Sequence, residues 1–143
     1  GKGRGMENAE ALAQFLNRTN PAHVVNFSMF LHKEVPLYED IRQGTFVPAD
    51  ELETIREEYH LIERIAPEKA GANILYDGFH DFIHVRVRGH LPGDKEKMLA
   101  KLSGIIQEYE GKEPVYSFVQ GECPDLEYCD DGKAVWDMDR KTS

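Results

Sequence analysis

Two amphipathic helical patterns on either side of a strand-like segment constrain the fold of this chain more than any other feature. The first pattern covers residues 50–65, where Asp50 and Glu53 have the spacing of a capping box. The second covers residues 94–110, where apolar residues recur every three or four positions. The stripe of the second helix consists of Met98, Leu102, Ile105 and Tyr109, widened by Leu99 and Ile106. We expect Leu102 and Ile106 to be buried against a sheet.

The segment between these helices has the pattern of a β-hairpin. Residues 72–76 and 79–88 are rich in apolar and β-branched side chains, and they flank the dipeptide Asp77-Gly78. Asp-Gly suits the positive φ angles of a type I′ turn, whose twist matches the two strands. The sequence therefore predicts a hairpin that turns at Asp77-Gly78.

The remaining elements give the fold class. Residues 9–17 are expected to form a short helix, and residues 114–120 and 134–140 to form strands. Residues 22–34 fit both patterns; Asn20 as an N-cap and Pro21 as the first helical residue favour a helix. We therefore predict an α+β domain with N-terminal helices followed by β-β-α-β-β. Its mostly antiparallel sheet has about four strands, with helices packed on it.

The length of 143 residues predicts one domain over residues 6–143, with residues 1–5 as a flexible leader or cloning remnant before a native start at Met6. The sequence shows no secretion signal or transmembrane segment, which predicts a cytoplasmic protein. Cys123 and Cys129 are then expected to be free thiols. We recognise no motif for a cofactor, a metal or a known catalytic centre, so a non-enzymatic protein is favoured.

The charge of the chain indicates what kind of partner it suits. The net charge is −9, from 26 acidic and 17 basic residues. Nucleic acids and anionic membranes require clustered Lys and Arg, so both are disfavoured as partners. The acids concentrate in residues 35–70 and 112–143, with nine and eight acidic residues respectively. This distribution favours a basic protein partner through long-range attraction.

Two acidic clusters are the candidate surface for such a partner. One is the expected exposed face of the helix at residues 50–65, and the other is the loop around the cysteines. The candidate partner-binding residues are Glu51, Glu57, Glu58, Glu122, Asp125, Glu127, Tyr128, Asp130 and Asp131. The leading hypothesis is a small acidic binding protein, for example an inhibitor or immunity protein that neutralises a toxic nuclease. An adaptor subunit of a larger assembly is a further alternative.

A cluster of histidines and arginines supports a different function. Alternation along an expected strand at residues 79–90 places His80, His84, Arg86, Arg88 and His90 on one face, together with Phe82. Neighbours on that face lie about 6 to 7 Å apart, so they could hold a phosphate or a carboxylate. The alternative function is therefore a small enzyme or anion-binding domain. An ordinary solvated strand face is the competing interpretation.

Overall fold

The computed structural model describes residues 1–119 and 122. Seven helices and strands follow one another: α1 (Gly5–Thr19), β1 (His23–Phe27), α2 (Pro36–Arg42), α3 (Glu51–Arg64), β2 (Ile74–His80), β3 (Val85–Leu91) and α4 (Lys95–Tyr109). A short 3-10 helix, η1 (Asp81–Ile83), joins β2 to β3. The α+β class predicted from the sequence is confirmed.

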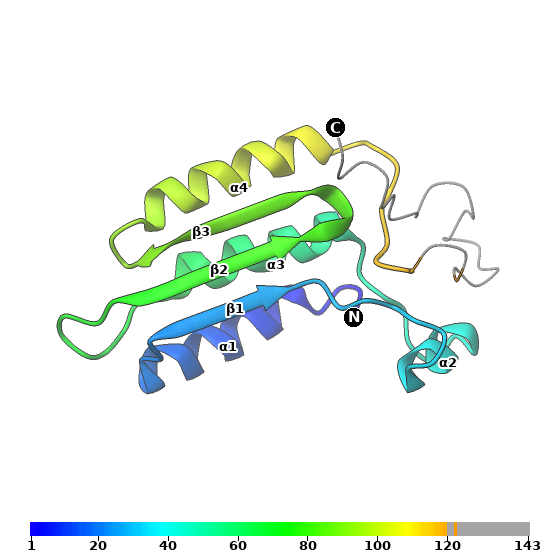
Figure 1. Cartoon of the computed structure of the whole chain (residues 1–143), viewed down its shortest axis with the longest axis horizontal. Coiled ribbons are helices and arrows are strands. Elements are labelled where there is room, and N and C mark those ends of the chain that lie inside the picture. Colours follow the sequence, from blue (N-terminus) through cyan, green and yellow to red (C-terminus); the bar gives the residue numbers. More distant parts are fainter. Residues whose placement is uncertain (120–121, 123–143) are drawn as a thin grey trace.

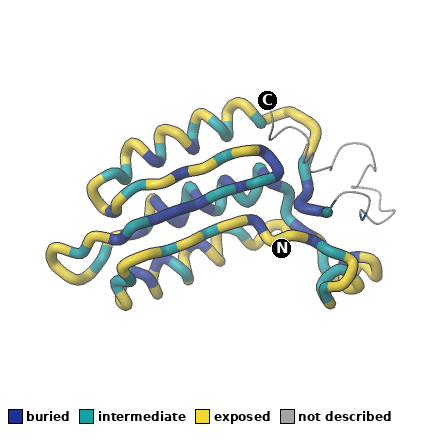
Figure 2. Tube along the Cα trace, viewed as in Figure 1, coloured by how far each residue is buried: buried dark blue, intermediate teal, exposed yellow. Residues whose placement is uncertain are grey.

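The three strands form one mixed sheet in the order β1-β2-β3. β1 pairs parallel to β2, and the connection between them contains α2 and α3. β2 pairs antiparallel to β3. Helices α1, α3 and α4 lie together on one side of the sheet, with α3 in the middle (Figure 1). Figure 2 shows that the central strand is largely buried, whereas β1 and β3 alternate between covered and exposed positions.

Residues 23–27 form a strand, so the helix favoured for residues 22–34 was wrong. Two adjacent valines, which lose side-chain freedom in a helix and fit a pleated strand, outweighed the Asn-Pro start. Asn20 does not cap a following helix. It ends α1 in the left-handed conformation, with φ of 48°, and its backbone N–H donates to the carbonyl of Leu16.

The hairpin also differs from the prediction. Asp77 and Gly78 lie inside β2, and the chain turns four residues later, at η1. His84 takes the left-handed conformation that closes the turn, with φ of 55°. The Asp-Gly pattern indicated a turn, but Gly78 lies within the strand, where its lack of a side chain leaves room for Glu58 of α3. The shift also changes which side chains share a face of the sheet.

Other predicted elements differ in smaller ways. Of the strand predicted at residues 114–120, the described part, residues 114–119, forms an isolated bridge between Leu31 and Phe118, and the described sheet has three strands rather than about four. Residues 36–42 form α2, a helix that was not predicted. Gly1 and Lys2 lie against residues 46–47, and Lys2 N donates to the carbonyl of Val47 at 2.9 Å; the leader expected at residues 1–5 stays a prediction. The strand predicted at residues 134–140 lies outside the described residues.

The main core lies between the sheet and the three helices. It includes Ile55 and Ile62 from α3, Val87 and Leu91 from β3, and Leu102 from α4, all 0 or 1% exposed. α1 packs against α3, and Ala9 and Ala13 of α1 are 1% and 2% exposed; small side chains of this kind allow two helices to approach closely. A second, smaller cluster joins α2 to the bridge region and contains Leu31, Ile41, Tyr116 and Phe118.

Replacement of Leu102 tests the packing of α4. Leu102 is fully buried, whereas Ile106, which we also expected to be buried, is only partly covered. Leu102→Ala should lower the free energy of unfolding by about 2 to 5 kcal/mol, because it removes buried methyl groups and leaves a cavity. Ile106→Ala should have a smaller effect. Urea denaturation of both variants gives the comparison, and equal small losses would show that α4 is not a core element.

Candidate functional site

A buried polar network lies beneath the central strand, between β2 and α3. Its centre is His80, the last residue of β2, which is 1% exposed and lies between two carboxyl groups of α3 that are 3% and 1% exposed, Glu51 and Glu58. His80 Nε2 is 2.7 Å from Glu58 Oε2, and His80 Nδ1 is 3.6 Å from Glu51 Oε2. The two glutamates are seven residues apart, which is two helical turns, so both reach the same strand.

Three further side chains complete the network. Ser28, one residue beyond β1, places its Oγ 3.1 Å from His80 Nδ1 and donates to Glu51 Oε2 at 2.9 Å. Tyr76 donates to Glu58 Oε1 at 2.9 Å, and Asn26 donates to the Tyr76 hydroxyl at the same distance. The network therefore ties β1, β2 and α3 together.

The protonation of His80 follows from its neighbours. Burial alone would lower the pKa of His80, but the hydrogen bonds and charges of Glu51 and Glu58 outweigh burial and raise the pKa to about 9. At neutral pH both ring nitrogens then carry protons, so Nε2–H donates to Glu58 and Nδ1–H donates to Ser28 Oγ. Burial and the charge of Glu58 raise the pKa of Tyr76 well above its usual value, which keeps its hydroxyl proton in place.

Ser28, His80 and Glu58 combine a hydroxyl, an imidazole and a carboxyl group, as a nucleophilic centre would. The direction of the hydrogen bonds opposes that function. A protonated His80 has no free nitrogen to accept a proton, and the Ser28 hydroxyl donates to Glu51. A cavity of about 30 Å³ borders Glu51, which is room for a water molecule but not for a substrate. The network therefore has a structural role, because it holds β1, β2 and α3 together. We call it the His80 network.

The opposite face of the sheet carries a regular array of side chains, and none of the described helices packs on it. Strand register places His23, Leu75 and His90 in one row, Val25, Asp77 and Arg88 in the next, and Phe27, Phe79 and Arg86 in the third. We call these nine residues the open face. On β1 it carries valine and phenylalanine, and on β3 it carries two arginines, with a histidine of each strand in the first row. Met29 and Phe30, both exposed, follow β1 after the buried residue Ser28.

The centre of the open face is held by Asp77. Arg86 donates twice to its carboxylate, at 3.0 and 2.7 Å, and the nearest nitrogen of Arg88 lies 3.8 Å away. The hydrogen bonds from Arg86 lower the pKa of Asp77, with smaller contributions from the charges of Arg86 and Arg88. Beside this group, the rings of Phe27 and Phe79 stack, with centroids 5.9 Å apart and planes inclined by 10°.

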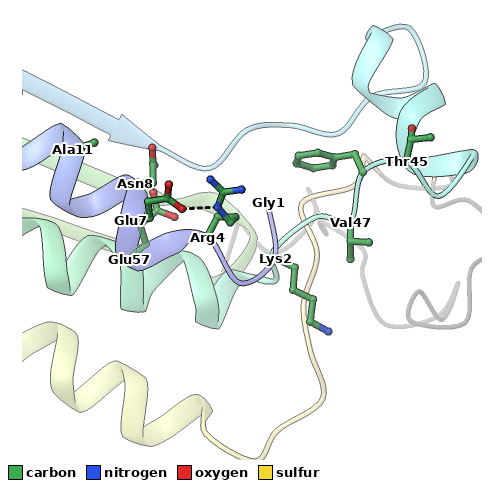
Figure 3. A pocket seen from close by; sticks show the side chains of 10 residues that line it. Gly1, Lys2, Arg4, Glu7, Asn8, Ala11, Thr45, Val47 and Glu57 are labelled. Atoms are coloured by element: carbon green, nitrogen blue, oxygen red, sulfur yellow. Dashed lines mark hydrogen bonds and ion pairs between the residues drawn. The ribbon is translucent and has the colours of Figure 1, made fainter.

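A hollow lies elsewhere, where the N-terminal residues meet α1 and the segment after α2. It has a volume of about 770 Å³ and is lined by Lys2, Arg4, Glu7, Asn8, Phe46 and Glu57, among others (Figure 3). Within it, Arg4 lies 2.6 Å from Glu7, and Asn8 donates to Glu57.

The structure separates the residues predicted to bind a basic partner. Glu51 and Glu58 are buried, so their placement on an exposed acidic face was wrong; they turn inward to hold His80. Glu57 is partly exposed and borders the hollow. Glu122 accepts a hydrogen bond from the backbone of Lys33 at 2.8 Å. The other predicted residues of the acidic loop, and both cysteines, lie outside the described residues: Cys123, Asp125, Glu127, Tyr128, Cys129, Asp130 and Asp131.

The histidine-arginine cluster is also divided. Arg86, Arg88 and His90 share the open face as predicted, but His80 faces the core and His84 lies at the turn, because η1 interrupts the expected strand. Phe82 is also in η1 and is buried. Sequence reasoning missed Ser28, Tyr76 and Asp77. With the turn placed at η1, alternation along β2 and β3 would have brought Asp77 beside the arginines.

Comparisons with protein-family models, with curated proteins and with solved structures found no match to this chain. Within residues 1–119 and 122, no helix is long and apolar enough to cross a membrane. The same residues contain no group of three or more His, Cys, Asp or Glu side chains arranged to hold a metal ion.

The His80 network predicts how stability changes with pH. The pKa of His80 is raised from 6.5 to about 9 on folding, so its contribution is complete below pH 6.5 and is lost as the pH rises through 9. The free energy of unfolding should fall by roughly 3 kcal/mol across this interval. Denaturant unfolding at a series of pH values measures it. His80→Gln should lack this slope and the exposed-site control His90→Gln should retain it; the same slope in both would contradict the assignment.

A Gly78→Ala substitution tests the contact between the strand and α3. A Cβ atom at residue 78 would lie 1.8 Å from Glu58 Oε1, so Glu58 would have to leave His80 and Tyr76. We expect a loss of roughly 3 kcal/mol or more in the free energy of unfolding. Gly104→Ala is the matched control, because a Cβ there meets no atom within 4 Å and alanine favours a helix. Thermal and urea denaturation should show the two substitutions moving stability in opposite directions.

Proposed function

We propose that this chain is a non-enzymatic protein-binding domain that docks a partner protein on the open face of its sheet. The observation that carries the proposal is the apolar half of that face. Val25 and Phe27 are 51% and 56% exposed, and Met29 and Phe30, two and three residues after Phe27 in the chain, are also exposed. Scattered exposed apolar side chains are ordinary, but a contiguous group of this kind is typical of an interaction site.

The composition of the open face fits a protein partner. Aromatic, methionine and arginine side chains are enriched in protein interfaces and supply most of their binding energy. Phe27 and Phe79 are already stacked, so they lose little conformational freedom on binding. The arginines are held by Asp77 and present ordered polar groups beside the aromatic pair. The His80 network beneath the sheet holds β1 and β2 in position and so keeps this surface in place.

The charge of the whole chain adds a preference for the partner. A net charge of −9 attracts a basic protein over a distance and speeds the first encounter. An inhibitor of a basic toxic nuclease would be one such protein, and an adaptor subunit would be another. The acidic loop near residues 122–131 could contribute to the attraction. The contact itself is proposed for the open face.

Anion binding by the arginines has less support. Asp77 occupies the bidentate side of Arg86 and also attracts Arg88, so an incoming phosphate or carboxylate would compete with a fixed carboxylate. His80, which could have served as a proton carrier, is buried among its own partners. The same arrangement argues against catalysis on this face.

Affinity capture from the native host with matched variants tests the proposed docking face. Phe27→Ser should reduce recovery of the partner at least tenfold relative to the original chain, because it removes a central aromatic contact. Phe15→Ser is the control: Phe15 is 61% exposed but lies on α1, away from the sheet face. Quantitative mass spectrometry of the captured proteins compares the baits. Full recovery with Phe27→Ser, together with loss on Glu57→Lys, would instead favour docking through acidic surface.

A further inference from the structure

The edge of the sheet at β1 is unusual in lacking charge. Residues 19–32 contain no Asp, Glu, Lys or Arg, and this is the longest such run in a chain with 30% charged residues. β1 lies within this run and is an edge strand, since β2 is its only neighbour in the described sheet. Exposed edges are usually protected by charged residues, proline or a bulge, because unpaired backbone groups attract other strands. No such protection occurs within His23–Phe27.

The backbone of β1 presents its free groups at three alternate residues. Leu75 N donates to the carbonyl of Ala22, so the backbone of Ala22 points toward β2. Alternation along the strand then directs Val24 and Asn26 toward β2, and His23, Val25 and Phe27 toward the free edge. These last three residues also place their side chains on the open face. Free backbone groups and exposed side chains therefore belong to the same residues.

We propose that two copies of this chain pair through β1, antiparallel, about a two-fold axis at Val25. In that register Val25 faces Val25 of the second copy, and His23 faces Phe27. All three outward-facing residues then occupy hydrogen-bonded pairs, in which each residue both donates and accepts. The result is a continuous six-stranded sheet. An isologous interface of this kind requires a strand that is complementary to itself, and the spacing of residues 23, 25 and 27 about Val25 satisfies the requirement.

The charge distribution favours a second copy at this position. Two chains of net charge −9 repel each other over most of their surfaces. The uncharged run at residues 19–32 is where two copies can approach without placing like charges in contact. Its cross-strand pairs would be valine with valine and histidine with phenylalanine, which are favourable combinations on a pleated surface.

Dimerisation through β1 would bring two copies of the proposed docking surface together. The dimer does not depend on the docking proposal. A two-fold axis perpendicular to the sheet keeps both open faces on the same side of the dimer. The two apolar halves, each on the β1 side of its own sheet, would meet in the middle, with the arginines at the outer margins. A partner with two equivalent contact sites would then bind with increased avidity. A monomer that still captures a partner would overturn the dimer alone.

Sedimentation equilibrium of the full chain and two variants tests the proposal. The original chain and Val25→Thr, which keeps the backbone N–H, should be dimers at about 100 μM and should dissociate on dilution. Val25→Pro removes an outward-facing N–H that makes no bond within the sheet, so it should weaken dimerisation at least tenfold. Circular dichroism checks that its fold is retained. A monomeric original chain, or equal dimerisation of a folded Val25→Pro, would overturn the proposal.

Hydrogen exchange of the original chain gives an answer even if Val25→Pro fails to fold. Exchange at the amides of His23, Val25 and Phe27 should slow as the protein concentration rises, because pairing with a second copy depends on concentration. The amide of Leu75, which is already bonded within the sheet, should change little. Protection of the three β1 amides that is independent of concentration, in a monomeric sample, would show that the edge is occupied from within the same chain and would overturn the proposal.

Discussion

The contact of His80 with Glu51 and Glu58 is the interaction on which the rest of the structure depends. A buried imidazolium is unfavourable unless its charge and both of its N–H groups are satisfied. Here the two glutamates supply the opposite charge, and Ser28 accepts the second hydrogen bond. Glu51 is also in the first turn of α3, where the positive end of the helix dipole favours a carboxylate. Loss of Glu58 would remove the nearest carboxylate from His80, and loss of Ser28 would leave a buried N–H group without its acceptor.

The His80 network also requires a glycine at position 78 of the strand above it. Glu58 can reach His80 and Tyr76 only because Gly78 has no side chain between them. The glycine is therefore a packing requirement of α3 rather than a turn residue. Because Ser28 and Asn26 belong to the same network, the end of β1 is held to β2 and α3 as well. The position of Phe27 on the open face thus depends on its two neighbours beneath the sheet.

The sequence predicted the helices better than the sheet. Capping residues and apolar spacing located α3 and α4 within one residue at each end, because both signals are local. The buried role of Glu51 and Glu58 was not recognised, since a glutamate on a helix is ordinarily solvated and its partner is 22 or more residues away in the chain. The turn at η1 was missed for a similar reason. The residues Asp81-Phe82-Ile83 carry no local signal that the strand ends there. Asp77-Gly78 carries a strong turn signal, but the glycine is required by a tertiary contact with α3.

A sheet covered by helices on one side has two ways to manage its other side. It can carry polar side chains there, or it can use an apolar surface for binding. The open face does both, with the division running along β2. Asp77 pairs with Arg86 and lies near Arg88 on the β3 side, while β1 keeps valine and phenylalanine exposed. An apolar edge strand is a hazard for aggregation unless its position is well controlled. The buried network supplies that control, because it holds β1 in register from below, while among the described residues no helix or further strand covers its open-face side or its outer edge.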